Sequence, residues 1–269
     1  MARHIYIILI SILLAVLPVK AARIDTIVAA SSFLPFPDTV LVIVPTAATS
    51  DSFPTAYLLH GYADTYRSWL RIRPDLPELA DRYGMIMVMP QGYDSWYWDS
   101  PANPSIKMES FITQDLVNRI DSLYPTRRDP AQRAITGLSM GGHGAMWLAM
   151  RHPDIWQNVG STSGGLDIRP FPNRWKISTL LGSQEEFPQN WEEYTVITRI
   201  PENVPEGLNI IFDCGTSDFF YDVNNNMHRA LETAGIPHDY ISRPGGHSAA
   251  YWANSILYHL MFFNEQFAK

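Results

Sequence analysis

A serine between two glycines, in Gly137-Leu138-Ser139-Met140-Gly141, is the feature of this sequence that most directly suggests chemistry. The run before it, residues 132–136, is partly β-branched and apolar as a buried strand is, and residues 142–151 have a helical pattern. A sharp turn between a strand and a helix strains the serine backbone and leaves room only for glycine two residues before and after it. The segment therefore predicts a nucleophile elbow with Ser139 as the nucleophile. The alternative is a glycine-rich turn whose serine caps a helix.

A nucleophilic serine needs a base, and the base needs an acid that orients it. A strand-like run at 208–212 leads into a turn that carries Asp218, and a run at 238–242 leads into a glycine-rich turn that carries His247. Serine, acid and then histidine is the order in which α/β-hydrolases supply these groups. We predict Asp218 as the acid and His247 as the base. Asp213 is the competing acid, but its place at the strand end gives it less freedom to reach an imidazole.

Backbone donors for a developing negative charge form the fourth part of such a site. An apolar strand at 57–59 ends in His60-Gly61-Tyr62, and a turn of this kind aims a backbone N–H at the tetrahedral oxyanion. The second donor is the N–H of the residue after the nucleophile. We predict the N–H groups of Tyr62 and Met140 as the two donors. His60 is interpreted as a residue that fixes this loop by hydrogen bonds and not as a catalytic base.

These residues need a sheet that brings several strand ends together, and the sequence alternates strands and helices accordingly. The strand candidates are short, near-continuous apolar runs typical of a sheet covered on both faces, and they span residues 40–44, 56–59, 85–89, 133–136, 158–162, 208–212 and 239–242. Two apolar stripes at helical spacing are interpreted as core: Ile112, Leu116, Ile120 and Leu123, then Trp252, Ile256, Leu260 and Phe263. The pattern predicts an α/β fold with a mostly parallel central sheet, helices on both faces and a modest cap insertion at 165–207.

Four ordered motifs give the chain a resemblance to the esterase D-like group of α/β-hydrolases. That group includes tributyrin-type esterases, acetyl xylan and feruloyl esterases, S-formylglutathione hydrolases and mycolyltransferases. The motifs are Leu58-Leu59-His60-Gly61 followed by Ser68-Trp69, Gly137-Leu138-Ser139-Met140-Gly141-Gly142, Cys214-Gly215-Thr216-Ser217-Asp218-Phe219, and Gly246-His247. The resemblance runs from about Val40 to the C-terminus and is greatest to the tributyrin-type and carbohydrate-esterase branch. It implies an α/β-hydrolase fold, the triad Ser139, Asp218 and His247, and the oxyanion donors Tyr62 and Met140.

An aromatic segment is the candidate for substrate choice. Trp96, Tyr97 and Trp98 follow the predicted strand at 85–89, so their rings are expected to wall the acyl or sugar pocket. The alternative is a packed surface loop. The predicted cap is also rich in aromatic side chains, and some of these must form the cap's own core.

The N-terminus predicts export. Arg3 and His4 precede an apolar run over residues 5–17, and residues 18–21 then end in alanine, so residues 1–21 are interpreted as a signal peptide cleaved after Ala21. The apolar run has about 13 residues, below the roughly 20 that a spanning helix needs. We therefore expect no stable membrane insertion after cleavage, one α/β-hydrolase domain over 22–269, and a periplasmic or secreted protein. Its only cysteine, Cys214, is expected to be buried and not a nucleophile.

Charge and composition exclude several classes of partner. The formal net charge is −7, and loss of the leader would remove basic but no acidic residues, which disfavours nucleic acid. No cluster of cysteine and histidine has metal-ligand spacing, so neither a metal nor another cofactor is predicted. The sequence predicts no oligomeric state.

We expect an exported serine carboxylic ester hydrolase that works through an acyl-enzyme. Its expected partners are small-molecule or polysaccharide esters with short-chain acyl, acetyl or feruloyl groups. The alternatives are an acyltransferase of the mycolyltransferase type and an S-formylglutathione hydrolase-like thioesterase, although export argues against mainly intracellular glutathione chemistry. Peptidase activity is a further option, although no propeller or other gating domain accompanies the predicted fold. A non-catalytic binding module is disfavoured because every triad position has a candidate.

Overall fold

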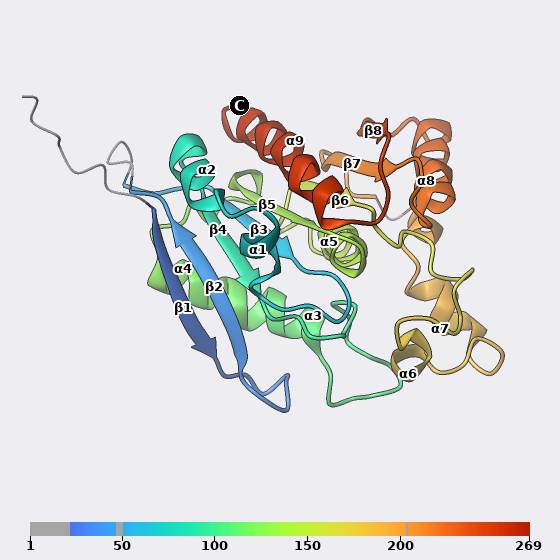
Figure 1. The fold of residues 1–269 in the computed structure, drawn as a ribbon. Coiled ribbons are helices and arrows are strands. Elements are labelled where there is room, and N and C mark those ends of the chain that lie inside the picture. Colours follow the sequence, from blue (N-terminus) through green and yellow to red (C-terminus); the bar gives the residue numbers. More distant parts are fainter. Residues whose placement is uncertain (1–21, 47–50, 203) are drawn as a thin grey trace, which may run out of the picture.

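The strands of this chain form one continuous sheet (Figure 1). The structure is a computed structural model, and it describes residues 22–46, 51–202 and 204–269. Within these residues the sheet has eight strands in the order β1-β2-β4-β3-β5-β6-β7-β8. The strands are β1 (Arg23–Ala29), β2 (Asp38–Val44), β3 (Thr55–Leu59), β4 (Ile86–Pro90), β5 (Arg133–Gly137), β6 (Asn158–Thr162), β7 (Asn209–Gly215) and β8 (Asp239–Arg243).

The sheet is antiparallel at one edge and parallel elsewhere. Strand β2 pairs antiparallel with both β1 and β4. From β4 onward in the order β4-β3-β5-β6-β7-β8, each strand pairs parallel with the next. Because parallel strands end at the same edge of a sheet, the loops after β3, β5, β7 and β8 meet there. These are the loops that carry the predicted site residues.

Helices cover both faces of this sheet (Figure 1). They are α1 (Ser68–Ile72), α2 (Leu76–Tyr83), α3 (Met108–Ser110), α4 (Val117–Leu123), α5 (Met140–Arg151), α6 (Ile177–Leu181), α7 (Pro188–Glu193), α8 (Tyr221–Thr233) and α9 (Ala249–Phe267). The other helical elements are the π-helix η1 (Phe111–Leu116) and the 3₁₀-helices η2 (Pro130–Gln132) and η3 (Ile197–Arg199). Helices α1, α2 and α9 pack on one face, and α4, α5 and α8 on the other.

The core lies in two layers because successive strand residues point to opposite faces of the sheet. In β5, for example, Ala134 packs with the α9 side and Ile135 with the α5 side, and neither is exposed. Because helices cover both faces of the sheet, the side chains of the central strands are buried on both sides, and their sequences are continuous apolar runs. Helices α6 and α7 and the turn η3 lie between β6 and β7, within the predicted cap region.

The predicted fold class is confirmed, and the α/β sheet has the expected helices on both faces. Strand β1 was not predicted. It is an edge strand with two half-exposed apolar side chains, Ile24 (47 %) and Val28 (58 %), so its sequence lacks the continuous apolar run of the inner strands. The predicted leader, residues 1–21, lies outside the described residues. Among the helices that are described, none has the length and apolar character to cross a membrane.

Candidate active site

The turn between β5 and α5 holds Ser139 in a strained conformation. Its φ of 55° and ψ of −117° are rare for a residue with a side chain. Glycines make the turn possible: a Cβ on Gly137 would lie 2.3 Å from the Gly141 carbonyl, and one on Gly141 would lie 2.4 Å from the Leu59 carbonyl oxygen. The tight packing of these backbones presents a half-buried Ser139 at the carboxyl edge of the sheet.

A continuous chain of hydrogen bonds joins the three predicted triad residues. The Oγ of Ser139 lies 3.0 Å from Nε2 of His247, and Nδ1 of His247 lies 2.9 Å from Oδ2 of Asp218. The Asp218 carboxylate also accepts a hydrogen bond from the backbone N–H of Phe220, at 2.8 Å. With its Nδ1 proton donated to Asp218, the imidazole has a free Nε2 lone pair that faces the serine hydroxyl.

Solvent does not reach the acid end of this chain. The Asp218 side chain is 0 % exposed and that of His247 is 17 % exposed. A buried carboxylate whose partners are an imidazole and a backbone N–H holds that ring in one orientation. The arrangement can transfer a proton from the serine hydroxyl to the imidazole.

The competing acid, Asp213, contacts a different histidine. Its carboxylate accepts a hydrogen bond from Nε2 of His259 at 2.9 Å, and Nδ1 of His259 lies 2.8 Å from the Thr136 hydroxyl. The hydroxyls of Thr162 and Ser255 also donate to Asp213. The structure therefore places Asp213 in a second, fully buried network and leaves Asp218 as the carboxylate in contact with His247.

The two predicted oxyanion donors lie at the start of α5 and in the loop after β3. Met140 begins α5, and Tyr62 follows the turn after Leu59. Among the described residues, no hydrogen-bond acceptor is found for the backbone N–H of either one. The loop after β3 is held by Trp69, whose Nε1 donates to the Leu59 oxygen at 2.9 Å, and by Tyr97, whose hydroxyl donates to the His60 oxygen at 3.0 Å.

The contacts of His60 are those of a residue that fixes a loop. Its ring nitrogens face the backbone oxygens of Gly61 and Gln91. Burial lowers the pKa of this imidazole below its usual range. No hydrogen bond between these described residues joins it to Ser139.

The aromatic segment after β4 is more deeply buried than expected. Trp96, Tyr97 and Trp98 are 1 %, 0 % and 0 % exposed. The two indoles stack at 5.4 Å, and Nε1 of Trp98 donates to Nε2 of His143 at 3.0 Å. In this structure the three rings are packed inside the protein core. They support the loop after β3 and helix α5 from within the core.

Other aromatic rings surround His247 instead. Phe219, which is 51 % exposed, has its ring centroid 4.2 Å from that of His247, and Trp252 meets the same imidazole edge-on at 4.9 Å. Trp175 from the cap region stacks on Phe219 at 5.6 Å. Phe219 lies directly after the predicted acid, so its position in the sequence is a signal that could have identified it. Trp175 reaches the site only through the folding of the cap.

The remaining reactive groups offer no second centre. Cys214 is buried, and burial raises the pKa of its thiol well above the usual range. His143 is buried between Trp98 and the Gly165 oxygen, and burial lowers its pKa to about 4. Within residues 22–46, 51–202 and 204–269, no group of histidine, cysteine, aspartate and glutamate side chains is arranged to hold a metal ion.

Comparison with known proteins connects this geometry to one family. The family model described as "Putative esterase" matches residues 31–263. An acetyl esterase of Caldicellulosiruptor saccharolyticus is 25 % identical over 221 residues, which cover 76 % of this chain and 80 % of the relative. An S-formylglutathione hydrolase of Rattus norvegicus is 23 % identical over 200 residues, covering 66 % and 69 % respectively.

A solved structure extends the likeness to the whole fold. A ferulic acid esterase is 27 % identical and superimposes with a TM-score of 0.78, covering 92 % of this chain and all of the other. These similarities confirm the predicted resemblance to the esterase D-like group.

Proposed function

The chain belongs to the esterase family that residues 31–263 match, and we propose that it is an exported serine hydrolase of carboxylic esters in which Ser139, His247 and Asp218 act as a catalytic triad. The observation that carries this proposal is the hydrogen-bonded chain from the Ser139 hydroxyl through His247 to the buried Asp218. It ends at a strained turn, and we assign the backbone N–H groups of Tyr62 and Met140 as the oxyanion donors that acyl transfer also needs.

In the proposed reaction Ser139 attacks the ester carbonyl carbon. Its proton moves to Nε2 of His247, whose cation is stabilised by Asp218. The tetrahedral intermediate then expels the alcohol, which takes the proton back from His247, and an acyl-enzyme remains on Ser139. Water attacks this acyl-enzyme by the same proton transfers and releases the carboxylic acid.

Negative charge on the former carbonyl oxygen is stabilised by the N–H groups of Tyr62 and Met140. The Met140 N–H is the first of helix α5, so the positive end of the helix dipole reinforces it. Because neither N–H donates to another described group, both are available for the oxyanion without rearrangement.

Short-chain acyl esters and polysaccharide-linked acetyl or feruloyl esters are the proposed substrates. An acetyl esterase and a ferulic acid esterase are among the proteins similar to this chain. The half-exposed rings of Phe219 and Trp175 next to His247 suit a planar group or the apolar face of a sugar.

Export is proposed from the sequence of residues 1–21 alone, with basic residues, an apolar run and alanine at the cleavage point. Expression of the full chain in a bacterial host, followed by mass measurement of the periplasmic or medium fraction, tests it. A product that begins at Ala22 supports the proposal. A full-length product that stays in the cell contradicts it.

Hydrolysis is tested with purified protein on acetylated xylan, methyl ferulate and short-chain aryl esters. The matched control is Ser139→Ala, because alanine fits the turn and removes only the nucleophilic oxygen. We expect wild-type turnover of at least one ester class and its near-complete loss in a variant whose circular dichroism is unchanged. Wild-type rates in the folded variant would contradict the proposed role of Ser139.

A further inference from the structure

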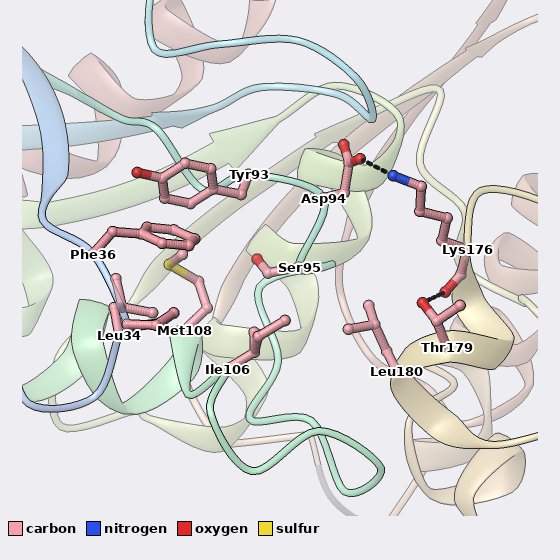
Figure 2. A pocket seen from close by; sticks show the side chains of 11 residues that line it. Leu34, Phe36, Tyr93, Asp94, Ser95, Ile106, Met108, Lys176, Thr179 and Leu180 are labelled. Carbon is pink, nitrogen blue, oxygen red and sulfur yellow. Dashed lines mark hydrogen bonds and ion pairs between the residues drawn. The ribbon is translucent and has the colours of Figure 1, made fainter.

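A cavity of about 260 Å³ lies between three segments that are distant in the sequence (Figure 2). It is bounded by the residues just before β2, by the loop after β4 and by helix α6. Apolar side chains make most of its wall, and they are Leu34, Phe36, Tyr93, Ile106, Met108 and Leu180. Nothing in the proposed mechanism uses this cavity.

The polar atoms of the wall are already engaged. The Tyr93 hydroxyl donates to the Pro37 oxygen, the Ser95 hydroxyl to the Gly92 oxygen, and the Thr179 hydroxyl to the Lys176 oxygen. A ligand inside therefore finds few free hydrogen-bonding groups on these side chains. The part of it that enters the cavity must be apolar.

Shape favours an aromatic ring over a long chain. Phe36 and Tyr93 meet edge to face with their centroids 4.6 Å apart, and Phe36 remains 47 % exposed. An apolar cavity of about 150 Å³ accepts benzene. The larger volume here accommodates one ring together with a short arm that leads out of it.

Two of the segments that line the cavity also contact parts of the candidate active site. Asp94 and Lys176, which both line the cavity, form an ion pair 3.2 Å long (Figure 2). Asp94 also accepts a hydrogen bond from the backbone N–H of Ala63, the residue after Tyr62. Lys176 follows Trp175, whose ring stacks on Phe219 beside His247. The same two segments thus border the cavity and flank the proposed triad.

We propose that this cavity binds the aromatic ring of an ester whose carbonyl lies at Ser139. The proposal rests on the proposed function, and it assigns substrate selection to Phe36 and Tyr93. A ring in the cavity is enclosed by apolar side chains. The arm that joins the ring to the ester passes the Asp94–Lys176 ion pair, whose two charges cancel. Esters without a ring gain nothing from the cavity.

The variant Phe36→Ala removes one wall of the cavity, and the matched control is Phe187→Ala. Phe187 is 49 % exposed and does not line the cavity. The measured quantity is kcat/KM for methyl ferulate divided by kcat/KM for ethyl acetate, which has no ring on either side of the ester. We expect this ratio to fall about five- to tenfold in Phe36→Ala, the size of one lost aromatic contact with its buried area, and to keep its wild-type value in Phe187→Ala.

A pair of isomeric esters tells which side of the ester carries the ring. Methyl 3-phenylpropanoate has it on the acyl side, and 3-phenylpropyl acetate has it on the alcohol side. A selective loss for either ester in Phe36→Ala supports the proposal and identifies the side. Equal losses for both aromatic esters and for ethyl acetate, or no loss at all, would overturn it.

Direct binding separates this inference from the proposed function. Methyl ferulate is titrated into Ser139→Ala protein and its Kd is measured by ligand-observed NMR, with and without Phe36→Ala. We expect Kd to rise about fivefold with the second change, whether or not the wild-type protein turns esters over. An unchanged Kd would refute the cavity as the aromatic site even in an active esterase.

Discussion

Two buried aspartates each hold a histidine, and exchanging each for asparagine should separate their roles. Asp213 pairs with His259 in a network that solvent does not reach, and Asp218 pairs with His247, which contacts Ser139. We expect Asp213→Asn to lower the free energy of unfolding with little change in turnover per folded molecule. We expect Asp218→Asn to lower turnover per folded molecule with little change in the free energy of unfolding.

The magnitude follows from the partners of the Asp213 carboxylate. Hydroxyl donors lie at 3.0 Å (Thr162) and 2.5 Å (Ser255), the His259 Nε2 lies at 2.9 Å, and an Arg243 guanidinium nitrogen lies at 4.0 Å. Hydrogen bonds to a charged group are worth about 1.5–3 kcal/mol each, and breaking a buried pair costs about 3–5 kcal/mol. Asparagine keeps the volume and one acceptor oxygen, so we expect a loss of about 3 kcal/mol, which a domain with typical stability survives.

Asp218→Asn acts on the reaction instead. The amide presents either an oxygen or an NH₂ group to Nδ1 of His247 and favours the imidazole tautomer whose Nε2 carries the proton. That nitrogen then cannot accept the serine proton, and kcat should fall by about four orders of magnitude, the size of this change in other triads.

Urea unfolding followed by tryptophan fluorescence gives the stabilities of both variants, and active-site titration with an activated ester gives turnover per competent molecule. The assignment of the acids is refuted if Asp213→Asn is stable but inactive while Asp218→Asn keeps the wild-type kcat.

Three further substitutions test the elbow, a buried carboxyl group and the aromatic core. Gly137→Ala should reduce both Tm and turnover severely, because its Cβ would lie 2.3 Å from the Gly141 carbonyl; a wild-type melting curve would contradict the close packing of the turn. Burial raises the pKa of Asp38 from 3.8 to about 7, so its contribution to stability is greatest below pH 4 and is lost as pH rises towards 7. Relative to wild type, Asp38→Asn should therefore gain stability across this window in urea titrations, and a constant difference from pH 4 to 8 would disprove the shift. Trp96→Ala should destabilise the fold by about 3–5 kcal/mol and lower kcat/KM for acetyl and feruloyl esters alike, whereas a loss confined to feruloyl esters would show that Trp96 contacts substrate.

Local sequence patterns were sufficient for the features that depend on neighbouring residues. Strand β6 spans 158–162 as predicted. The elbow was equally visible, since the glycines at 137 and 141 are required by contacts within the turn itself. The serine, acid and histidine that the chain order suggested are brought into one hydrogen-bonded chain.

Features that depend on contacts between distant segments could not be predicted from local sequence patterns. The exposure of Trp96 is set by Trp175, whose backbone oxygen accepts the Trp96 Nε1 hydrogen bond across 79 positions of sequence. No periodicity carries that information, so an aromatic run in a loop looked like a pocket wall. The partner of Asp213 is equally remote, because His259 lies on α9 in a pattern typical of an ordinary core helix. The cavity beside Phe36 comes from three separate segments that only the folded chain assembles.

The central claim is that Ser139 carries the acyl group between two half-reactions. Rapid mixing of the wild-type protein with p-nitrophenyl acetate, acid quenching and peptide mass spectrometry test it directly. The account predicts a burst of one equivalent of p-nitrophenol per active protein, and an added acetyl group on the peptide that contains Ser139 and on no other. Three results would contradict the account. They are turnover without a burst, an acetyl group on a residue other than Ser139, and the same label in Ser139→Ala.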